Sequence, residues 1–246
     1  MRIFLFDVDG TLVESGEKIS GEMVKILTEL SIYGDLGIVG GGTYNKISNQ
    51  LGDEALKLFK YVFAESGSSY YKDGILLHQN DIRTHPSYTL INRLKKVALR
   101  YLSGLEGYEL SGTILDQRSG LLYISLIGMQ ATPSERKNFI QLDSVHNYRT
   151  TLLSILKKDA GNDDSLEITL GGSVGIGIYP KEWNKGQVLK YISEYDTIYY
   201  FGDKYLPNGN DYPLLFNDRV NGICVDNPEM TIDKISTLHG NTTNKN

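Results

Sequence analysis

The chain has 246 residues, a formal net charge of −5 and one cysteine, Cys224. The acidic balance excludes a general basic surface for nucleic acid or for anionic membranes, and the lone cysteine excludes an intrachain disulfide. No apolar run approaches the ~18 residues of a membrane span, and acids interrupt the N-terminal apolar run too early for a signal peptide. We therefore expect a folded, cytoplasmic protein with no nucleic-acid or membrane partner.

The first predicted element is a buried parallel strand, because Ile3 to Phe6 is a short continuous apolar run. Asp7 and Asp9 follow it, and open α/β sheets place their active sites at the carboxyl ends of their strands. Asp7 can attack a phosphoryl group and form an aspartyl phosphate, while Asp9 can exchange a proton with the leaving and entering oxygens. A divalent cation, for which Mg²⁺ is suited, has to neutralise these carboxylates beside a phosphate. An Asp-Gly turn alone is common, but the whole string Asp-Val-Asp-Gly-Thr-Leu favours the functional interpretation.

A glycine-rich loop is expected after the second strand. The spacing of apolar residues predicts a helix over residues 20–33, with Ser20 as its N-cap, and a strand over 36–39. That strand runs into Gly40-Gly41-Gly42-Thr43, and a strand, glycines and a helix start together form a backbone cradle for anions. Gly41 and Thr43 are therefore candidate phosphate contacts. A simple glycine-rich turn is the alternative.

The next elements complete the first part of an α/β domain. Helices are predicted over residues 44–51 and 55–59, and a third core strand over 61–63. Lys72-Asp73-Gly74 lies between two apolar runs and predicts the turn of a β-hairpin.

The pattern changes near residue 82, where helices begin to alternate with antiparallel pairs of strands. The expected helices and strands cover residues 86–102, 113–115, 121–127, 148–156, 166–170 and 174–178, and a further helix begins at Pro133. Helices segregated on an antiparallel sheet make an α+β arrangement. We expect residues 82–182 to form a domain inserted into an α/β domain of residues 1–81 and 183–246, the latter ending in a polar tail.

The first domain then resumes with a second acidic strand end. Trp183-Asn184-Lys185-Gly186 opens a helix, and a strand over residues 197–201 ends at Gly202-Asp203. In a doubly wound sheet Asp203 can lie beside Asp7, so the predicted metal site consists of both carboxylates and the Asp9 backbone carbonyl. Asn210 and Asp211 would hold this loop or add an outer contact. A strand over residues 222–225 and a helix over 228–238 follow.

Several of these segments resemble known families. Asp-Val-Asp-Gly-Thr-Leu resembles the signature of the haloacid dehalogenase (HAD) superfamily of phosphotransferases. Val-Gly-Gly, Glu-Ser-Gly, Tyr-Lys-Asp-Gly, Trp-x-Lys and Gly-Asp-Lys-Tyr-Leu-Pro-Asn-Gly-Asn-Asp are similar to segments of the eukaryotic-type phosphomannomutases, and the similarity extends from residue 2 to about 235. The resemblance implies a doubly wound, Rossmann-like HAD core with an inserted α+β cap. It further implies interconversion of hexose 6- and 1-phosphates, activation by a hexose 1,6-bisphosphate, and a homodimer formed through the cap.

The resemblance also assigns roles to single residues. Asp7 becomes the nucleophile, Asp9 the acid and base, and Lys185 the cation that balances the transferring phosphoryl oxygens. Lys185 at a helix start is otherwise expected to be solvated. Arg118 and Arg136 match family arginines, and their guanidinium groups suit a second phosphate. Either could instead be an ordinary surface arginine.

The chain departs from the family at several substrate positions. Gly42 stands where the family has Ser, and Gly16 and Met129 stand where it has Arg. Gly175 and Gly177, still expected at the substrate, replace a Ser and an Asp that hold the sugar phosphate and hydroxyls. Two alternatives to a mutase therefore stay open: a phosphatase of altered specificity, and a non-catalytic paralogue kept for binding.

Overall fold

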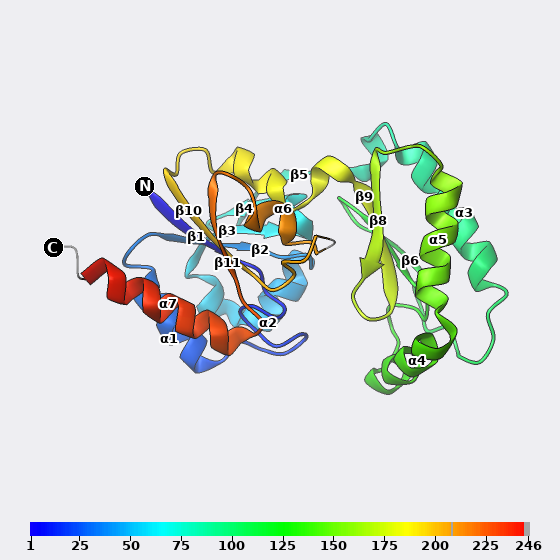
Figure 1. Cartoon of the computed structure of the whole chain (residues 1–246), viewed down its shortest axis with the longest axis horizontal. Coiled ribbons are helices and arrows are strands. Elements are labelled where there is room, and N and C mark those ends of the chain that lie inside the picture. Colours follow the sequence, from blue (N-terminus) through cyan, green and yellow to red (C-terminus); the bar gives the residue numbers. More distant parts are fainter. Residues whose placement is uncertain (208, 244–246) are drawn as a thin grey trace. The chain divides into compact units, whose positions relative to one another are not determined.

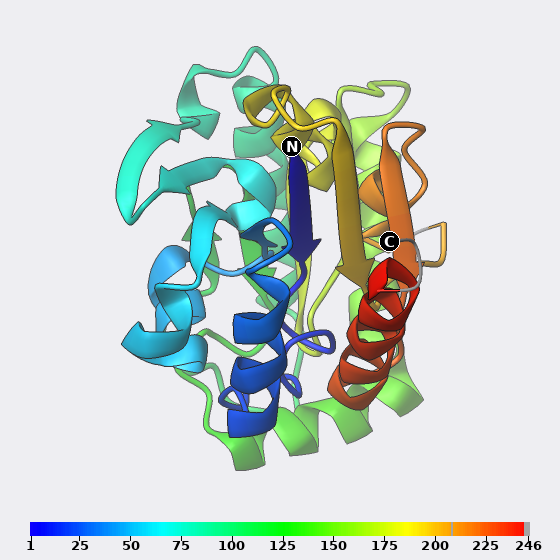
Figure 2. The ribbon, with the colours of Figure 1, turned by 90° about the vertical axis from the view of Figure 1, so that its left-hand side faces the viewer.

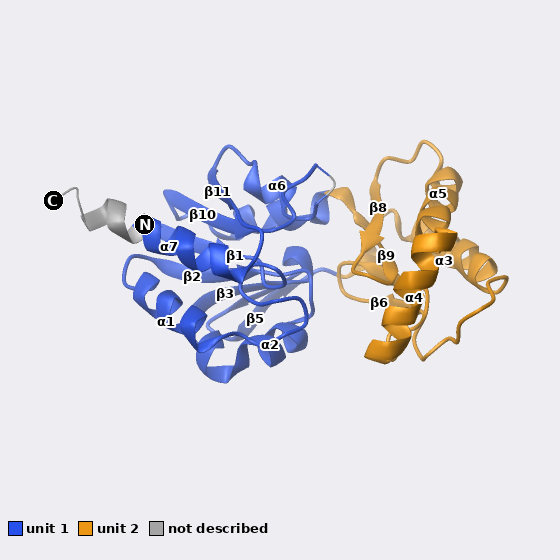
Figure 3. Cartoon of the chain, turned by 60° about the horizontal axis from the view of Figure 1, so that its bottom comes forward, with its two compact units in different colours: residues 1–80, 182–246 blue, residues 81–181 orange. Residues whose placement is uncertain are grey.

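The structure is a computed structural model that describes residues 1–207 and 209–243 (Figure 1). The chain forms two compact units, the first from residues 1–80 and 182–246 and the second from residues 81–181 (Figure 3). Among the described residues, no helix has the length and apolar character that crossing a membrane requires.

The first unit is built on a seven-stranded sheet in the order β11-β10-β1-β2-β3-β4-β5. The strands are β1 (Arg2–Phe6), β2 (Asp35–Val39), β3 (Phe59–Ala64), β4 (Ser69–Lys72), β5 (Ile75–Gln79), β10 (Thr197–Gly202) and β11 (Val220–Cys224). The first five strands in this order are parallel to one another. β4 pairs antiparallel with β3, and β5 pairs antiparallel with β4. Figure 2 shows β1 and β10 side by side and pointing in the same direction. The predicted α/β class is confirmed.

Helical segments cover both faces of this sheet. They are α1 (Gly21–Leu30), α2 (Tyr44–Leu56), α6 (Tyr212–Leu215), α7 (Pro228–Thr243) and the 3₁₀ segments η1 (Glu65–Gly67) and η4 (Lys185–Tyr191), while η3 (Lys181–Trp183) is the segment in which the chain returns from the second unit. Alternate residues of β1 serve the two faces, as the pleat of a strand requires. Phe4 and Phe6 pack with α1, α2 and α7, and Ile3 and Leu5 pack with η4 and α6. The doubly wound arrangement therefore follows from the apolar run that opens the chain.

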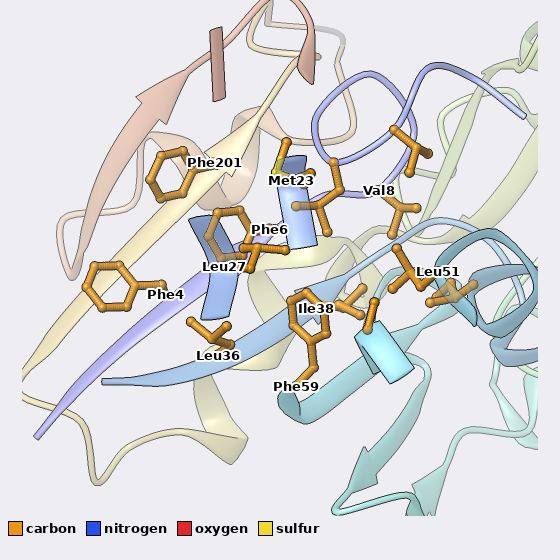
Figure 4. Packing of buried hydrophobic residues seen from close by; sticks show 14 of the residues in the cluster. Phe4, Phe6, Val8, Met23, Leu27, Leu36, Ile38, Leu51, Phe59 and Phe201 are labelled. Carbon is orange, nitrogen blue, oxygen red and sulfur yellow. The ribbon is translucent and has the colours of Figure 1, made fainter. Parts of the chain in front are cut away.

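The core on the α1 side is rich in stacked aromatic rings. Phe6 and Phe201 lie on neighbouring strands with their ring centroids 4.7 Å apart and nearly parallel (Figure 4). Leu27 of α1 and Ile38 of β2 are completely buried in the same cluster. Burial of each such side chain contributes about 1.5–3 kcal/mol, so this cluster fixes the central strands whose ends carry the acids.

The second unit is an antiparallel sheet covered by helices, and the predicted α+β arrangement is observed. Its strands are β6 (Leu115–Gln117), β7 (Leu122–Ser125), β8 (Leu166–Gly171) and β9 (Gly175–Pro180), in the order β6-β7-β9-β8. Its helical segments are η2 (Ile82–Thr84), α3 (Tyr88–Leu102), α4 (Pro133–His146) and α5 (Tyr148–Ala160). Leu122 and Ile124 pair with Ile178 and Ile176 across the sheet, and all four side chains are buried.

Local signals in the sequence set several element boundaries. The Ser20 hydroxyl accepts a hydrogen bond from the Met23 backbone N at 3.1 Å, as expected of the N-cap of α1. Pro133 begins α4 at its first position. Asp73 and Gly74, with φ of 49° and 77°, form the predicted hairpin turn between β4 and β5.

Two expected boundaries are wrong. The helix predicted over residues 55–59 ends at Leu56, and Phe59 begins β3, where it pairs with Leu36 and is buried. The strand predicted over residues 113–115 is shifted to β6, because the Thr113 backbone N donates to the Gln130 side chain at 2.7 Å instead of joining the ladder. α7 continues to Thr243 into the expected polar tail, and residues 244–246 lie outside the described residues.

Candidate active site

Asp7 and Asp203 follow the carboxyl ends of two adjacent parallel strands. β1 and β10 pair in register up to Phe6 and Phe201, and the Asp7 backbone N donates to the Phe201 carbonyl at 2.9 Å. Gly10 has a φ of +85°, and an ideal Cβ there would lie 2.4 Å from Asp203 Oδ2. Only glycine fits this approach without displacing the carboxylate. The loop that carries Asp7 and Asp9 thus lies directly against Asp203.

A buried ammonium group joins Asp7 to a second carboxylate. The Lys185 side chain is fully buried, and its Nζ donates to Asp7 Oδ1 and to Asp211 Oδ1, each at 2.6 Å, and to the Tyr200 hydroxyl at 3.2 Å. Asp211 also accepts hydrogen bonds from the Tyr200 hydroxyl and from the Lys204 backbone N, the latter at 2.9 Å. Lys185 is therefore buried and paired with two acids, and the alternative of a solvated lysine at a helix start does not apply.

Burial and charge together set the protonation of this cluster. Burial raises the pKa of Asp7 to about 7, although Lys185 acts in the opposite direction. Burial also acts to raise the pKa of Asp211, but the charge of Lys185 and the hydrogen bonds from Lys185, Tyr200 and the Lys204 backbone together outweigh it and lower that pKa. Burial would lower the pKa of Lys185, but Asp211 and Asp7 raise it, so the ammonium group is charged. The single positive charge of Lys185 does not neutralise both carboxylates, so a further cation beside Asp7 would be favourable.

The acidic residues fit a divalent cation. Ligand oxygens of Asp7, Asp203 and Asp211 all lie within 4.8 Å of one another. Asp203 Oδ1 is buried and has no hydrogen-bond partner among the described residues, and burial raises the pKa of this carboxyl group. Both oxygens of Asp211 already accept hydrogen bonds, so Asp7 and Asp203 offer the freer ligand atoms. Hard carboxylate oxygens suit a cation such as Mg²⁺.

The Asp9 carboxylate is hydrogen-bonded to two side chains of α2, and the sequence did not predict these contacts. It accepts hydrogen bonds from the Gly16 backbone N at 3.0 Å, from Gln50 Nε2 at 2.8 Å and from Lys46 Nζ. Burial would raise the pKa of Asp9, but the hydrogen bonds from Lys46 and Gln50 outweigh it and lower that pKa. Lys46 and Gln50 are four residues apart and so share one face of α2, which is the only signal of this pair in the sequence.

The glycine-rich loop lies at the same end of the sheet. An ideal Cβ at Gly41 would lie 3.6 Å from Asn210 Nδ2, in ordinary contact with the loop that follows Asp203. Thr43 is the N-cap of α2, and its hydroxyl accepts a hydrogen bond from the Lys46 backbone N at 3.3 Å. The hydroxyl hydrogen of Thr43 is available to an anion, because a hydroxyl both accepts and donates.

A strained turn at Glu65 and Ser66 is hydrogen-bonded to the glycine-rich loop. Glu65 and Ser66 have positive φ values of 51° and 58°, which are uncommon for residues with side chains. Their backbone N–H groups donate to the carbonyls of Gly42 and Gly40, each at 2.9 Å. Gln187 of η4 donates to the Ser66 carbonyl at 2.9 Å. The turn thereby ties the glycine-rich loop to the 3₁₀ segment that carries Lys185.

The two predicted substrate arginines lie in the second unit, and both are anchored. Arg118 Nε donates to Asp116 Oδ2 at 2.8 Å, and its guanidinium carbon lies 5.5 Å from the centre of the Tyr123 ring. Arg136 donates to the carbonyls of Ala131 and Met129, at 3.0 and 2.8 Å. A guanidinium group has five N–H donors, so each arginine keeps donors for a ligand.

Tyr123 fills the side-chain position at one of the two glycines expected at the substrate. An ideal Cβ at Gly175 would lie 2.4 Å from Tyr123 Cζ, whereas one at Gly177 would meet no heavy atom within 4 Å. The Tyr123 hydroxyl donates to the Gly171 carbonyl at 2.8 Å, which fixes the ring across this face of the sheet. Residue 175 is therefore glycine because the aromatic ring occupies its side-chain position, while a side chain at residue 177 would enter open space.

Known proteins with similar structures share this fold at low sequence identity. The C-terminal domain of trehalose-6-phosphate phosphatase from C. albicans superposes with a TM-score of 0.62 at 16% identity, covering 97% of this chain and 92% of that one. An IMP-bound IMP-nucleotidase mutant from Plasmodium falciparum gives a TM-score of 0.63 at 16% identity, covering 98% and 67%. These likenesses identify the fold.

Closer relatives are found by sequence. Phosphomannomutase 2 of Dictyostelium discoideum is 37% identical over 220 residues, covering 89% of this chain and 88% of the relative. A phosphomannomutase of Solanum lycopersicum is 34% identical over 236 residues, covering 96% and 93%. The model of the family described as eukaryotic phosphomannomutase matches residues 23–240. The chain therefore belongs to the eukaryotic phosphomannomutase family of enzymes.

Proposed function

We propose that the chain interconverts hexose 6-phosphate and hexose 1-phosphate, with mannose phosphates as the first candidates. The observation that carries this proposal is the ammonium group of Lys185, buried between Asp7 and Asp211 beside the unpartnered oxygen of Asp203. A buried carboxylate that is held by one cation and lies beside a second acid is a positioned nucleophile with a place for a metal.

The reaction proceeds in two transfers at Asp7. A carboxylate oxygen of Asp7 attacks phosphorus, the ester bond between phosphorus and the sugar oxygen breaks, and Asp9 delivers a proton to that oxygen. In the second transfer Asp9 takes a proton from the free hydroxyl of a hexose monophosphate, which attacks the phosphorus, forms a hexose 1,6-bisphosphate and frees Asp7. The bisphosphate then binds in the opposite orientation and returns its other phosphoryl group to Asp7. A hexose 1,6-bisphosphate would phosphorylate Asp7 at the start of the cycle. Lys185 stabilises negative charge on the transferring oxygens without having to move.

The other site residues bind and orient the substrate. Asp7, Asp203 and the Asp9 backbone carbonyl would hold Mg²⁺, which supplies neutralisation of the carboxylates and of the phosphoryl oxygens. Gly41 and Thr43 offer donors to the transferring phosphate at the start of α2. Arg118 and Arg136 of the second unit offer charged donors to the other phosphate.

Gly175 and Gly177 line the sugar position with backbone alone, beside Tyr123. We also propose a cytoplasmic homodimer formed through the second unit.

A phosphatase is the second candidate, favoured by the open space at Gly177, where no side chain is present to contact a sugar. A sugar phosphate held by fewer contacts leaves after its phosphoryl group has passed to Asp7, and water then accepts that group from the aspartyl phosphate. The two activities share every step up to the aspartyl phosphate. They differ only in which oxygen removes the phosphoryl group.

One assay decides between the candidates. Mannose 1-phosphate is supplied with a hexose 1,6-bisphosphate and saturating Mg²⁺, and mannose 6-phosphate and free phosphate are measured together. A mutase forms more 6-phosphate than free phosphate, and a phosphatase shows the reverse. Asp7→Asn should abolish both products. If neither product forms with mannose or glucose phosphates, the proposed transfer is wrong, and a non-catalytic role is left.

A further inference from the structure

A cavity lies beside the Asp9 carboxylate, within the first unit. It has a volume of about 490 Å³ and is lined by Gly16, Glu17, Lys18, Lys46, Asn49 and Gln50. This volume falls in the range of small-molecule sites. Two of the lining residues are lysines and one is acidic, and one of the lysines, Lys46, pairs with the Asp9 carboxylate.

Both oxygens of the Asp9 carboxylate accept hydrogen bonds in this structure. Its carboxylate accepts hydrogen bonds from the Gly16 backbone, from Gln50 and from Lys46, and all three residues line the cavity. Two of these contacts hold the Asp9 carboxylate against α2, whereas the Asp7 carboxylate is held by Lys185 of η4. An acid–base group has to reach the reacting oxygen, so at least one contact of Asp9 has to be released during the reaction.

Lys46 is the partner that can leave. Its side chain is 48% exposed, whereas Gln50 is only 6% exposed and is fixed in the core of the unit. Gln50 Oε1 is buried and has no hydrogen-bond partner among the described residues, so the amide is held by its contacts through Nε2. The stem of Lys46 lies against Gly42, where an ideal Cβ would be 3.0 Å from Lys46 Cδ. Glycine at residue 42 thus leaves space for this lysine over the loop.

We propose that Lys46 exchanges partners when a phosphorylated substrate enters this cavity. In the free protein Lys46 pairs with Asp9. In the complex it pairs with the phosphate monoester dianion, and Asp9 is released to act as acid and base. A dianion attracts an ammonium group more strongly than a single carboxylate does. Lys46 is then a positioning residue that couples arrival of the phosphate to the availability of Asp9. The inference rests on the proposed function, because only there does Asp9 move protons.

Steady-state kinetics test the exchange. Lys46→Met removes a charged hydrogen bond to the substrate, so its KM for mannose 1-phosphate should rise about tenfold. Its kcat should fall by less than about threefold, because Asp9 is no longer held by the lysine. Lys46→Arg should restore much of the KM. The matched control is Lys57→Met, which removes an exposed lysine that pairs with Glu54 near the end of the same helix.

A binding measurement separates this inference from the proposed reaction. Metal-free protein is titrated with inorganic phosphate by calorimetry, so that no turnover is needed. Wild type and Lys57→Met should bind phosphate equally, and Lys46→Met should bind at least about fivefold more weakly. Equal binding by all three proteins, or no binding by wild type, overturns the partner exchange, as does an unchanged KM in a folded Lys46→Met protein. Absence of phosphoryl transfer in wild type instead overturns the proposed function and leaves the binding result to stand alone.

Discussion

Gly10 and Asp203 come so close that a single carbon atom added to Gly10 would lie 2.4 Å from the Asp203 carboxylate. The two residues are 193 positions apart, and they meet because β1 and β10 are adjacent parallel strands. The glycine therefore has a role in the candidate metal site as well as in the turn.

The first prediction concerns this contact. Gly10→Ala should displace the Asp203 carboxylate, weaken binding of Mg²⁺ and lower phosphoryl transfer at least about tenfold. Gly74→Ala is the matched control, because Gly74 also has a positive φ, +77°, but an ideal Cβ there meets nothing within 4 Å. Both variants should lose similar thermal stability from backbone strain, and only Gly10→Ala should lose metal affinity, measured by calorimetry. Equal metal affinity in the two variants would show that the contact with Asp203 is unimportant.

The second prediction concerns the buried ammonium group. Lys185→Met leaves Asp7 and Asp211 without their cation inside the protein, which should cost about 3–5 kcal/mol in the free energy of unfolding. It should also reduce kcat at least about a hundredfold, since the fixed positive charge that holds Asp7 is lost. Urea denaturation and the mutase assay measure the two effects. Lys57→Met, at an exposed ion pair, should leave both unchanged. A stable Lys185→Met protein would mean that one of the two acids is protonated in the folded state.

The third prediction concerns pH and the end of the sheet away from the acids. Burial would raise the pKa of Asp35, but hydrogen bonds from Lys60 and Tyr195 outweigh it and lower that pKa. The carboxylate therefore stabilises the folded state above its unfolded pKa of about 3.9, and this contribution disappears as the pH falls through the lower folded value.

The test compares wild type with Asp35→Asn in urea. Asp35→Asn should be less stable by up to about 1 kcal/mol near pH 6, because the ion pair is partly exposed. The difference should shrink as the pH is lowered below the unfolded pKa. Asp218→Asn, at an exposed position, is the control and should leave the stability near pH 6 unchanged. A difference that stays constant down to about pH 3 would assign the loss to packing instead of charge.

The fourth prediction concerns the second unit. Gly175→Ser should destabilise it by about 1–3 kcal/mol, because the new side chain overlaps the Tyr123 ring. Gly177→Asp should be tolerated, because its Cβ enters open space. In the double variant Tyr123→Ala with Gly175→Ser, the loss should be smaller than the sum of the two single losses, as measured by thermal unfolding. Additive losses would mean that the ring moves aside at no cost.

Much of the fold could be predicted because its signals are local. The strand before Asp7, the Ser20 cap and the Asp73-Gly74 turn depend on neighbours in the sequence, and all three are observed. Phe59 was assigned to a helix because a short apolar run does not distinguish a helix end from a strand start. Its pairing with Leu36 decided the outcome, and that contact is not local.

The candidate site could be predicted only in part, for the same reason. Strand-end acids are visible in the sequence, and so Asp7 and Asp203 were placed together by sheet topology. The contact between Lys46 and Asp9 was not predicted, since a lysine on an amphipathic helix ordinarily faces water. Tyr123 was missed because its ring occupies space left by a glycine on another strand, Gly175. A large side chain that fills the position left by a small residue on another strand can be recognised only when the folded structure is known.

The pairing of β1 with β10 has a consequence for synthesis of the chain. β1 can pair with β2 as soon as residues 2–39 have been made, but its other edge stays open until Thr197–Gly202 follows. Pairings between strands so distant in sequence form late, since a long loop must close first. During elongation on the ribosome, the second unit emerges while one edge of the central strand is still unpaired. Asp7 is thus made well before Lys185 and Asp203, the residues that complete its surroundings.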